Sequence, residues 1–531
     1  MARIPAGLWD RGWVRILLAL LLGVAAALAH PPFGMVPGLL AYPALMILSE
    51  RSRRLRGGFA MGWWFGFGYF LLGCWWVAEA FFVNPEQAWM APIAVSALPA
   101  GIGLFTGLAT LAYRALKPRG PWRFLAFVLA FSALEWVRGH ILTGFPWNPV
   151  GASWQAGSAM SQMASVVGVY GLGLLTLLGI SAFAPILTQP RNRTAQSIAL
   201  GGLAVLFAML GFGNGRLSNA TVEDSPVLAR IVQADVSQES KWSADAYQQI
   251  LNRYLILTSQ PAARTPDVVI WPESALPDLA NNILAGSDAV QIAAALTEGQ
   301  TLLTGLSRAE RQPDGKVTYF NSLIELNSLG ARGMQVGQTY DKYRLVPFGE
   351  YLPLGDLMGS LGIRRIVQMP EDLSAGPKPE PLVLARLPKV QPLICYESLF
   401  PGFTDGSARG RPDWIVNVSN DAWFGRTSGP VQHLNMASYR AIETGLPIAR
   451  ATPTGISAMI DPLGRIVEGS RIGHGEAKAV DVFVPKPLLP TVFGRFGHLP
   501  YGVGLLFLGV IVAMLQWRPN IRGSEFGARA A

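Results

Sequence analysis

Eight apolar runs constrain this chain more than any other feature of its sequence, because each approaches the roughly 20 residues that a helix needs to cross a bilayer. The runs cover residues 13–29, 34–49, 58–82, 90–113, 124–142, 160–187, 196–213 and 499–517. The second run is short and contains Pro37 and Pro43. The fifth contains Glu135 and Arg138, which are expected either to pair within their helix or to contact a lipid headgroup. The pattern predicts a bundle of eight membrane-spanning helices.

The acidic residues divide the chain into two halves. Of the 34 acidic side chains, only five precede residue 216, namely Asp10, Glu50, Glu79, Glu86 and Glu135. Charged residues make up 15% of the chain, against about 25% in soluble proteins, which excludes an ordinary soluble enzyme. An apolar content of 50% excludes a disordered chain. The sequence therefore predicts one membrane half and one water-soluble half.

Basic residues in the loops indicate the orientation of the spans. They gather after the second, fourth and sixth runs, at Arg51, Arg53, Arg54, Arg56, Arg114, Lys117, Arg119, Arg123, Arg191 and Arg193. Lys and Arg accumulate on the cytoplasmic side of a membrane, so both termini are expected there and the segment between runs seven and eight outside. The first run also resembles a cleavable signal peptide ending in Ala27-Leu28-Ala29, although an uncleaved anchor is favoured.

The texture of the sequence changes between residues 220 and 487, where short β-rich runs alternate with helical patterns. Strands are predicted at 227–236, 268–271, 301–306, 319–326, 390–396, 414–419 and 456–460, and helices at 242–259 and 431–444. This is the pattern of an α/β domain. The predicted organisation is a membrane domain over 1–219 with seven spans, a catalytic domain over 220–487, and a last span with a cytoplasmic tail over 488–531.

Several other classes of function are excluded. The net charge of +9 suggests nucleic acid, but the soluble half has no basic stripe interleaved with aromatic residues. The two cysteines, Cys74 and Cys395, are too few for a disulfide framework and lack the nearby partners of a zinc site. His433 is interpreted as a core histidine and not as a metal ligand. We expect no metal and no diffusible cofactor.

Three segments of the soluble half each carry one reactive side chain among apolar, Pro or Gly neighbours. These side chains are Glu273, Lys342 and Cys395. Each alone has an ordinary explanation as a turn residue, a surface charge or an inert core thiol. Together, a carboxylate, an ammonium and a thiol are the groups that acyl transfer through a thioester needs.

The chemistry assigns a role to each member of this triad. A free thiol has a pKa of about 8.5, and its thiolate is the nucleophile, so Cys395 needs a base or a nearby cation. Glu273 would be the base, which typically contributes about 10²- to 10⁴-fold. Lys342 would favour the thiolate and stabilise the oxyanion that forms on the attacked carbonyl. Glu350 would orient Lys342, and Glu397 would either do the same or be structural.

The amino-acid sequences of these three segments resemble the motifs of a known family. WPESALP, YDKYRLVPFGEYLP and ICYESLFP are similar to the Glu, Lys and Cys motifs of the nitrilase (carbon-nitrogen hydrolase) superfamily. With a multispan N-terminus and one C-terminal span, the chain resembles the bacterial apolipoprotein N-acyltransferase family. The resemblance implies an αββα nitrilase-like sandwich inserted between spans seven and eight. Arg344 stands where this family commonly has His, and Pro453 lies in a turn where Asn is usual.

The resemblance also implies a reaction and its partners. A multi-pass protein of the bacterial cytoplasmic (inner) membrane, with its catalytic domain in the periplasm, would act as a monomer. Cys395 would take an acyl chain from a glycerophospholipid and pass it to the α-amino group of a diacylglyceryl-cysteine lipoprotein, in a ping-pong mechanism. Tyr396 would support the site, and Trp242, Asn420 and Trp423 would bind substrate. The apolar segment 352–369 would be either a buried helix or a mobile arm in the membrane interface.

Two alternative functions remain open on sequence alone. A membrane-tethered amidase or nitrilase would use the same triad to hydrolyse a small carbon-nitrogen substrate. A transporter with a regulatory soluble domain would need ionisable pairs at mid-membrane and internally related halves, and neither is evident.

Overall fold

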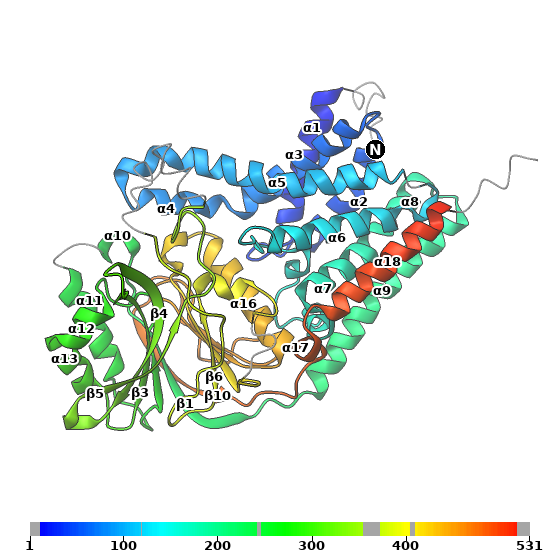
Figure 1. Cartoon of the computed structure of the whole chain (residues 1–531). Coiled ribbons are helices and arrows are strands. Elements are labelled where there is room, and N and C mark those ends of the chain that lie inside the picture. The colour runs from blue at the N-terminus through cyan, green and yellow to red at the C-terminus, as the bar shows by residue number, and fades with distance from the viewer. Residues whose placement is uncertain (1–10, 118, 242–245, 354–371, 404–408, 518–531) are drawn as a thin grey trace, which may run out of the picture.

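The computed structural model describes residues 11–117, 119–241, 246–353, 372–403 and 409–517. A group of apolar helices lies beside a domain of two β-sheets, and the sheet domain comes between helices α9 and α18 in chain order (Figure 1). The main apolar helices are α1 (Gly12–Ala27), α2 (Ala41–Glu50), α3 (Leu55–Gly73), α5 (Ala91–Ala115), α6 (Phe124–His140), α7 (Ala164–Ser181), α8 (Ala184–Thr188), α9 (Arg193–Asn219) and α18 (Leu499–Trp517).

Helix length separates these elements into two sets. Within the described residues, four helical stretches are long and apolar enough to cross a membrane, namely Pro85–Ala115, Met160–Thr188, Arg193–Asn219 and Leu499–Gln516. A fifth is formed if Leu55–Gly73 and Trp75–Phe82, which meet at an angle of 62°, count as one span. Gly12–Ala27 and Val36–Glu50 are apolar but shorter. The count of eight spans therefore stays a prediction.

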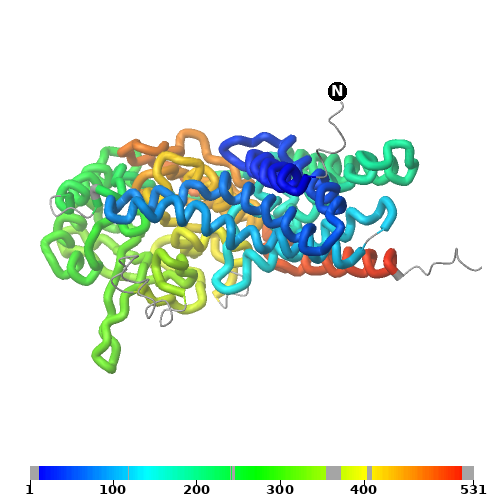
Figure 2. Tube along the Cα trace, turned by 90° about the horizontal axis from the view of Figure 1, so that it is seen from above, coloured from blue at the N-terminus to red at the C-terminus, as the bar shows by residue number. Residues whose placement is uncertain are grey.

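One arm of the helical domain extends over the sheets. Figures 1 and 2 show α5 running from the helix bundle out above the sheet domain. The preceding segment consists of η3 (Trp75–Ala78), α4 (Glu79–Phe82) and η4 (Pro85–Met90), and it contacts the 3-10 helix η10 (Asp421–Phe424). The rings of Trp76 and Phe424 lie 4.6 Å apart in an edge-on arrangement. Aromatic packing therefore joins the two halves of the molecule at this point.

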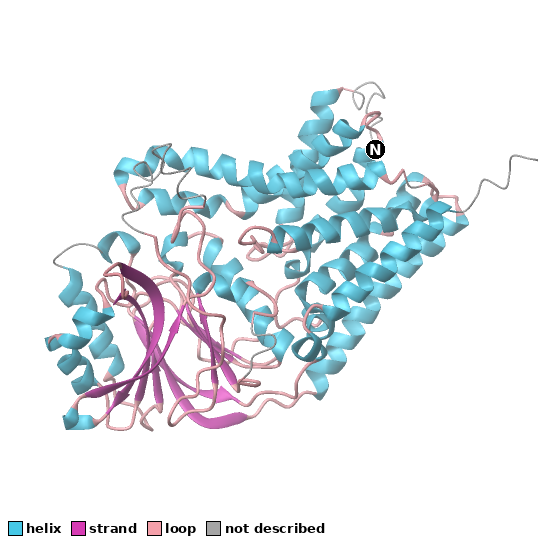
Figure 3. Ribbon diagram, viewed as in Figure 1, coloured by secondary structure: helices cyan, strands magenta, loops and turns pink. Residues whose placement is uncertain are grey.

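The sheet domain has four layers, helix, sheet, sheet and helix (Figure 3). The six-stranded sheet has the order β10-β1-β2-β3-β4-β5, and the four-stranded sheet has the order β6-β7-β8-β9. The strands are β1 (Asp224–Gln233), β2 (Val268–Ile270), β3 (Thr301–Arg311), β4 (Val317–Ser328), β5 (Met334–Asp341), β6 (Val390–Ile394), β7 (Trp414–Val418), β8 (Ile448–Ala451), β9 (Ala458–Ile460) and β10 (Lys478–Pro485). The predicted α/β class of this domain is confirmed.

Each layer is held by its own hydrophobic core. Branched residues such as Ile231 and Val416 fill the space between the two sheets. Helices α11 (Ala246–Thr258), α12 (Ala280–Ala285) and α13 (Ser287–Ala295) pack on the outer face of the larger sheet. Because β1, β2 and β3 are parallel neighbours, as are β6, β7 and β8, their carboxyl ends gather at common sheet edges. Glu273 and Cys395 follow two of these strand ends.

Helix α16 (Gly429–Thr444) belongs to the sheet domain and to the helical domain at once. Its Leu434 and Ala441 pack on the smaller sheet, whereas Met436, Tyr439 and Ile442 join the core of the apolar helices. The Tyr439 hydroxyl donates hydrogen bonds to main-chain oxygens of the helical domain, including that of Trp154 at 2.6 Å. The helix therefore has two apolar faces and lies between two cores.

A break in α7 provides a further link between the halves. Gly168 has a φ of +68°, and a Cβ added there would lie 2.3 Å from the Phe493 ring. The break leaves the Val169 N–H without a helical acceptor, and the Glu443 carboxylate of α16 accepts it at 2.8 Å. The carboxylate thus caps the second part of α7 from the other domain.

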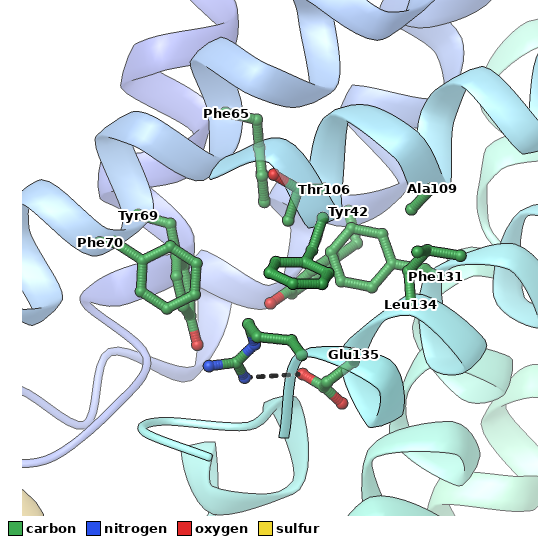
Figure 4. A pocket seen from close by; sticks show the side chains of 11 residues that line it. Tyr42, Phe65, Tyr69, Phe70, Thr106, Ala109, Phe131, Leu134 and Glu135 are labelled. Carbon is green, nitrogen blue, oxygen red and sulfur yellow. Dashed lines mark ion pairs between the residues drawn. The ribbon is translucent and has the colours of Figure 1, made fainter. Parts of the chain in front are cut away.

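Glu135 and Arg138 on α6 pair within their helix, with 3.9 Å between Arg138 Nη2 and Glu135 Oε1. Both are buried beside a pocket lined mainly by aromatic side chains (Figure 4). Arg138 also donates hydrogen bonds of 2.8 Å to the main-chain oxygens of Phe145 and Trp147, and Glu135 accepts the Val150 N–H. The pair therefore holds the loop that follows α6 against its own helix.

Candidate active site

Glu273 lies three residues beyond the end of β2, buried between the sheet edges. Its Oε1 accepts hydrogen bonds from Asn321 Nδ2 at 2.7 Å and from Lys342 Nζ at 3.2 Å. Its Oε2 is buried and has no hydrogen-bond partner among the described residues. One carboxylate oxygen is thus held in place while the other is left to accept a proton. Gly305 permits this approach, because a Cβ there would lie 2.6 Å from the Glu273 Cα.

Lys342 is the first residue after β5, and its side chain is fully buried. Its Nζ lies 2.8 Å from Glu350 Oε1 as well as 3.2 Å from Glu273 Oε1. Burial lowers the pKa of Lys342, but the two carboxylates outweigh it and raise the pKa above its usual value. Lys342 is therefore a fixed positive charge at neutral pH.

Asn321 is a member of the site that the sequence analysis missed. It lies in β4, and its side-chain nitrogen bonds Glu273 and also Glu350 Oε1 at 3.0 Å. Its main-chain oxygen accepts the Lys342 N–H at 2.8 Å. Asn is uncommon within strands, so its position inside β4 was the available signal.

Cys395 directly follows β6 and opens the 3-10 helix η9 (Cys395–Leu399), here called the cysteine turn. Its φ of +50° is left-handed, a conformation that costs a non-glycine residue about 1–3 kcal/mol and is common at active sites. The main chain of Asn420 donates a hydrogen bond to its sulfur. The strained turn therefore holds the thiol in one direction.

The protonation of Cys395 follows from its surroundings. Burial is the largest cause and raises the pKa of the thiol, and the Glu273 charge raises it further. Lys342 and the Asn420 N–H act in the opposite direction but do not outweigh them. The resting group is the thiol, so reaction requires a base that removes its proton at the moment of attack.

The Glu397 carboxylate joins the cysteine turn to the lysine loop, defined as residues 341–350. Its Oε1 accepts the main-chain N–H groups of Tyr343 at 2.7 Å and Arg344 at 3.0 Å, and the Tyr340 hydroxyl at 2.8 Å. Its Oε2 accepts the N–H of Ile394 at 2.8 Å. Burial raises the pKa of Glu397 to about 7, against the effect of these hydrogen bonds. Of the two roles predicted for Glu397, these contacts favour the structural one.

Tyr396 connects the cysteine turn to the helical domain. Its hydroxyl donates a hydrogen bond of 2.7 Å to the main-chain oxygen of Gly144, in the loop after α6. Its ring packs edge-on against Phe400 at 5.1 Å. The nucleophile is thus anchored to both halves of the molecule.

A buried polar network lies behind the cysteine turn. His433 Nδ1 is 2.9 Å from Asp421 Oδ1, and its Nε2 is 3.2 Å from the main-chain oxygen of Cys395. Arg450 also binds Asp421, at 2.8 Å. As predicted, His433 is a hydrogen-bonded core histidine. Among the described residues, no group of three His, Cys, Asp or Glu side chains is placed to hold a metal ion.

The predicted substrate-binding residues have different outcomes. The Asn420 side chain is buried and bonds Gln238 at 3.2 Å, whereas Trp423 is 40% exposed. The role of Asn420 and Trp423 in binding substrate stays a prediction. Trp242 and most of the predicted arm over 352–369 lie outside the described residues.

Lys241 is a second buried cation that the sequence analysis did not single out. Its ammonium donates a hydrogen bond to the main-chain oxygen of Ser274, the residue after Glu273. Burial lowers the pKa of Lys241 to about 8, although the Glu273 charge opposes this change. Lys241 therefore fixes the turn that carries Glu273.

The carbon-nitrogen hydrolase family model matches residues 228–477, so the sandwich has the nitrilase-like fold of that class of enzymes. A second model, the apolipoprotein N-acyltransferase N-terminal domain, matches residues 22–182. An apolipoprotein N-acyltransferase from Caulobacter vibrioides is 47% identical over 96% of each chain, and one from Rhodopseudomonas palustris is 37% identical over 98% of each chain. The chain therefore belongs to the apolipoprotein N-acyltransferase family, and it is an acyltransferase.

One solved structure resembles the chain distantly. The crystal structure of an amidase from Nesterenkonia sp. is 19% identical, with a TM-score of 0.34, and covers 50% of this chain and 94% of that chain.

Proposed function

We propose that this enzyme moves a fatty acyl chain from a membrane glycerophospholipid to the α-amino group of a diacylglyceryl-cysteine lipoprotein, through a thioester on Cys395. Lipoprotein N-acylation is the activity of its family. The observation that carries the proposal is the difference between the two oxygens of Glu273. Lys342 and Asn321 bind one of them, and the other has no hydrogen-bond partner among the residues that the structure describes. A base held in this way suits a thiol whose pKa is raised.

In the first half-reaction, Glu273 takes the Cys395 proton and the sulfur attacks the ester carbonyl at the sn-1 position of the donor. The oxyanion that forms is stabilised by Lys342, whose charge Glu350 helps to hold in place. The carbon-oxygen bond then breaks, and Glu273 returns the proton to the departing glycerol oxygen. The products are a lysophospholipid and the acyl thioester.

In the second half-reaction, the lipoprotein amine attacks the thioester carbonyl and its proton passes to Glu273. The carbon-sulfur bond breaks, the thiolate takes a proton from Glu273, and an amide remains on the lipoprotein. No water is consumed in either step. The buried position of the triad supports this outcome, because an exposed thioester would be hydrolysed.

The proposed setting is the bacterial inner membrane, with eight spans and the catalytic domain in the periplasm between spans seven and eight. Boundaries at 1–219, 220–487 and 488–531 fit the chain order of the helices and sheets. The loops that are rich in Lys and Arg support this orientation. The proposal includes a monomer, as the family resemblance implies.

Mass spectrometry of the purified full-length protein tests the proposal. After brief exposure to phosphatidylethanolamine, we expect one fatty acyl mass on Cys395, removable by hydroxylamine, together with one equivalent of lysophospholipid. Cys395→Ala should carry no label, and Cys74→Ser, which changes the other cysteine, should label like the wild type. A wild-type protein that hydrolyses small amides but takes no acyl label from the phospholipid would contradict the proposal and support the amidase.

A further inference from the structure

In the part of the chain that the structure describes, no acidic side chain pairs with Arg344. It lies two residues after Lys342 on the lysine loop, and its nearest polar contact is a long one, 3.5 Å from Nη1 to the main-chain oxygen of Thr143. Within the described residues, its Nε is buried without a hydrogen-bond partner, and its guanidinium takes part in no ion pair. By contrast, Arg440 and Arg450 in the same domain each pair with a carboxylate.

The guanidinium is nevertheless held in place. It lies over the ring of Phe400, with 4.8 Å from Cζ to the ring centroid. This stacking fixes the plane of the group and leaves its N–H edges available for another ligand. A guanidinium with most of its donors unused beside an active site is typical of an anion-binding residue.

Backbone hydrogen bonds connect Arg344 to the segment that carries Cys395. Its N–H is bound by Glu397, whose other oxygen binds the N–H of Ile394, the residue before Cys395. Phe400 also follows the cysteine turn directly. An anion bound by Arg344 would therefore have a fixed position relative to the Cys395 sulfur.

The surroundings of Arg344 indicate which anion this is. Next to Thr143, Ile141 is 50% exposed and Leu142 is 94% exposed, and Phe348 on the lysine loop is 52% exposed. Exposed apolar side chains beside an unpaired cation match the boundary between the acyl chains and the charged headgroups of a lipid. The anion at this level of a phospholipid is its phosphate.

We propose that Arg344 binds the phosphate of the acyl donor and so selects charged glycerophospholipids over neutral lipids. The inference rests on the proposed acylation of Cys395 by a glycerophospholipid and adds the feature of that donor that is recognised. Arg344 is a specificity residue, because its contact is with the headgroup and not with the reacting ester. No bond forms or breaks at this site.

Two donors that differ by one charge test the proposal on the full-length enzyme. They are phosphatidylmethanol and its neutral dimethyl phosphotriester, with identical acyl chains, presented in the same nonionic detergent. The rate of thioester formation at Cys395 is measured for each by mass spectrometry in a single turnover. We expect the wild type to prefer the charged donor, and Arg344→Gln to reduce that preference by about 10- to 100-fold, as for loss of a hydrogen bond to a charged group.

The ratio of the two rates within one variant does not depend on how much of the protein is folded. Arg344→Lys keeps the positive charge but loses the paired N–H donors of the guanidinium. Its preference for the charged donor should lie between those of the wild type and Arg344→Gln. Arg332→Gln, which removes an exposed arginine from the β4–β5 connection, is the matched control and should keep the wild-type ratio. Equal use of both donors by the wild type, or an unchanged ratio in Arg344→Gln, would overturn the inference while the thioester itself still forms. A wild type that forms no thioester with either donor would overturn the proposed function as well.

Discussion

The Glu397 carboxylate accepts the main-chain N–H of Tyr343 at 2.7 Å, and this bond ties the loop that carries Lys342 to the turn that carries Cys395. The same side chain binds Ile394 on the other side. The distance between ammonium and sulfur is thus set by a residue that need not touch the substrate.

Replacing Glu397 by Gln should therefore separate the two loops. The amide can accept on one side only, so at least one buried N–H group loses its partner, at a cost of about 1–3 kcal/mol. We expect single-turnover acylation of Cys395 to fall by about 100-fold or more, with a lower thermal midpoint. Glu310→Gln, at an exposed position on β3, is the control. Normal acylation in Glu397→Gln would show that the carboxylate does not hold the loops.

Glu273→Gln should have opposite effects on two reactions of the same thiol. The Glu273 charge raises the pKa of Cys395, so its removal lowers that pKa and increases the thiolate fraction at a given pH. Alkylation by iodoacetamide should therefore reach its half-maximal rate at a lower pH than in the wild type. Acylation by lipid should fall about 10²- to 10⁴-fold, because the base is lost. A shift of the alkylation profile to higher pH would contradict the effect assigned to the Glu273 charge. Both the wild type and Glu273→Gln should carry Cys74→Ser, so that Cys395 is the one thiol that reacts.

A negative charge in place of the Asn321 amide should impair acylation. Its amide nitrogen donates to Glu273 and Glu350, so Asn321→Asp would place a third carboxylate against two that already share one ammonium. We expect acylation to fall more in Asn321→Asp than in Asn321→Ala, by about tenfold, at pH 7. The difference should narrow as the pH is lowered and the added carboxyl group is protonated. Equal losses in the two variants at every pH would mean that only the shape of Asn321 matters.

Gly168 should resist substitution although it lies in an apolar helix. Alanine there would have a strained positive φ and would meet the Phe493 ring. We expect Gly168→Ala to lower the thermal midpoint, at a cost of about 1–3 kcal/mol. Gly211→Ala in α9 is the control, because an added Cβ meets nothing within 4 Å, and it should be neutral or stabilising. Adding Phe493→Ala to Gly168→Ala would relieve the contact but not the strain.

The reactive residues were predictable because each sits in a short motif at the end of a strand. Strand pairing alone could not place Glu273 near Cys395, because Glu273 follows β2 of the six-stranded sheet and Cys395 follows β6 of the four-stranded sheet. The three motifs were grouped by their chemistry and by the family resemblance. Asn321 was missed because it lies inside a strand, and its partner Glu273 is 48 residues away. Strands β5, β8 and β10 were not predicted. β5 and β10 are exposed along much of their length, and β8 has Arg450 among its four residues, so none of them has a clear apolar pattern.

The helical half shows where hydropathy is insufficient. Residues 160–187 form one apolar run, yet the chain breaks at Gly168, because an acceptor 274 residues away at Glu443 compensates the break. The run over 58–82 likewise bends by 62° near Cys74. Apolar composition predicts that a segment enters lipid, but tertiary hydrogen bonds decide where its helix bends.

The double-sided packing of α16 affects how this enzyme can be dissected. If residues 220–487 were expressed without their flanking helices, Met436, Tyr439 and Ile442 would be turned from interior to water. Such a fragment would be prone to aggregate, and its cysteine turn would lose the Gly144 anchor of Tyr396. The sandwich is therefore completed by the helical domain that packs against α16.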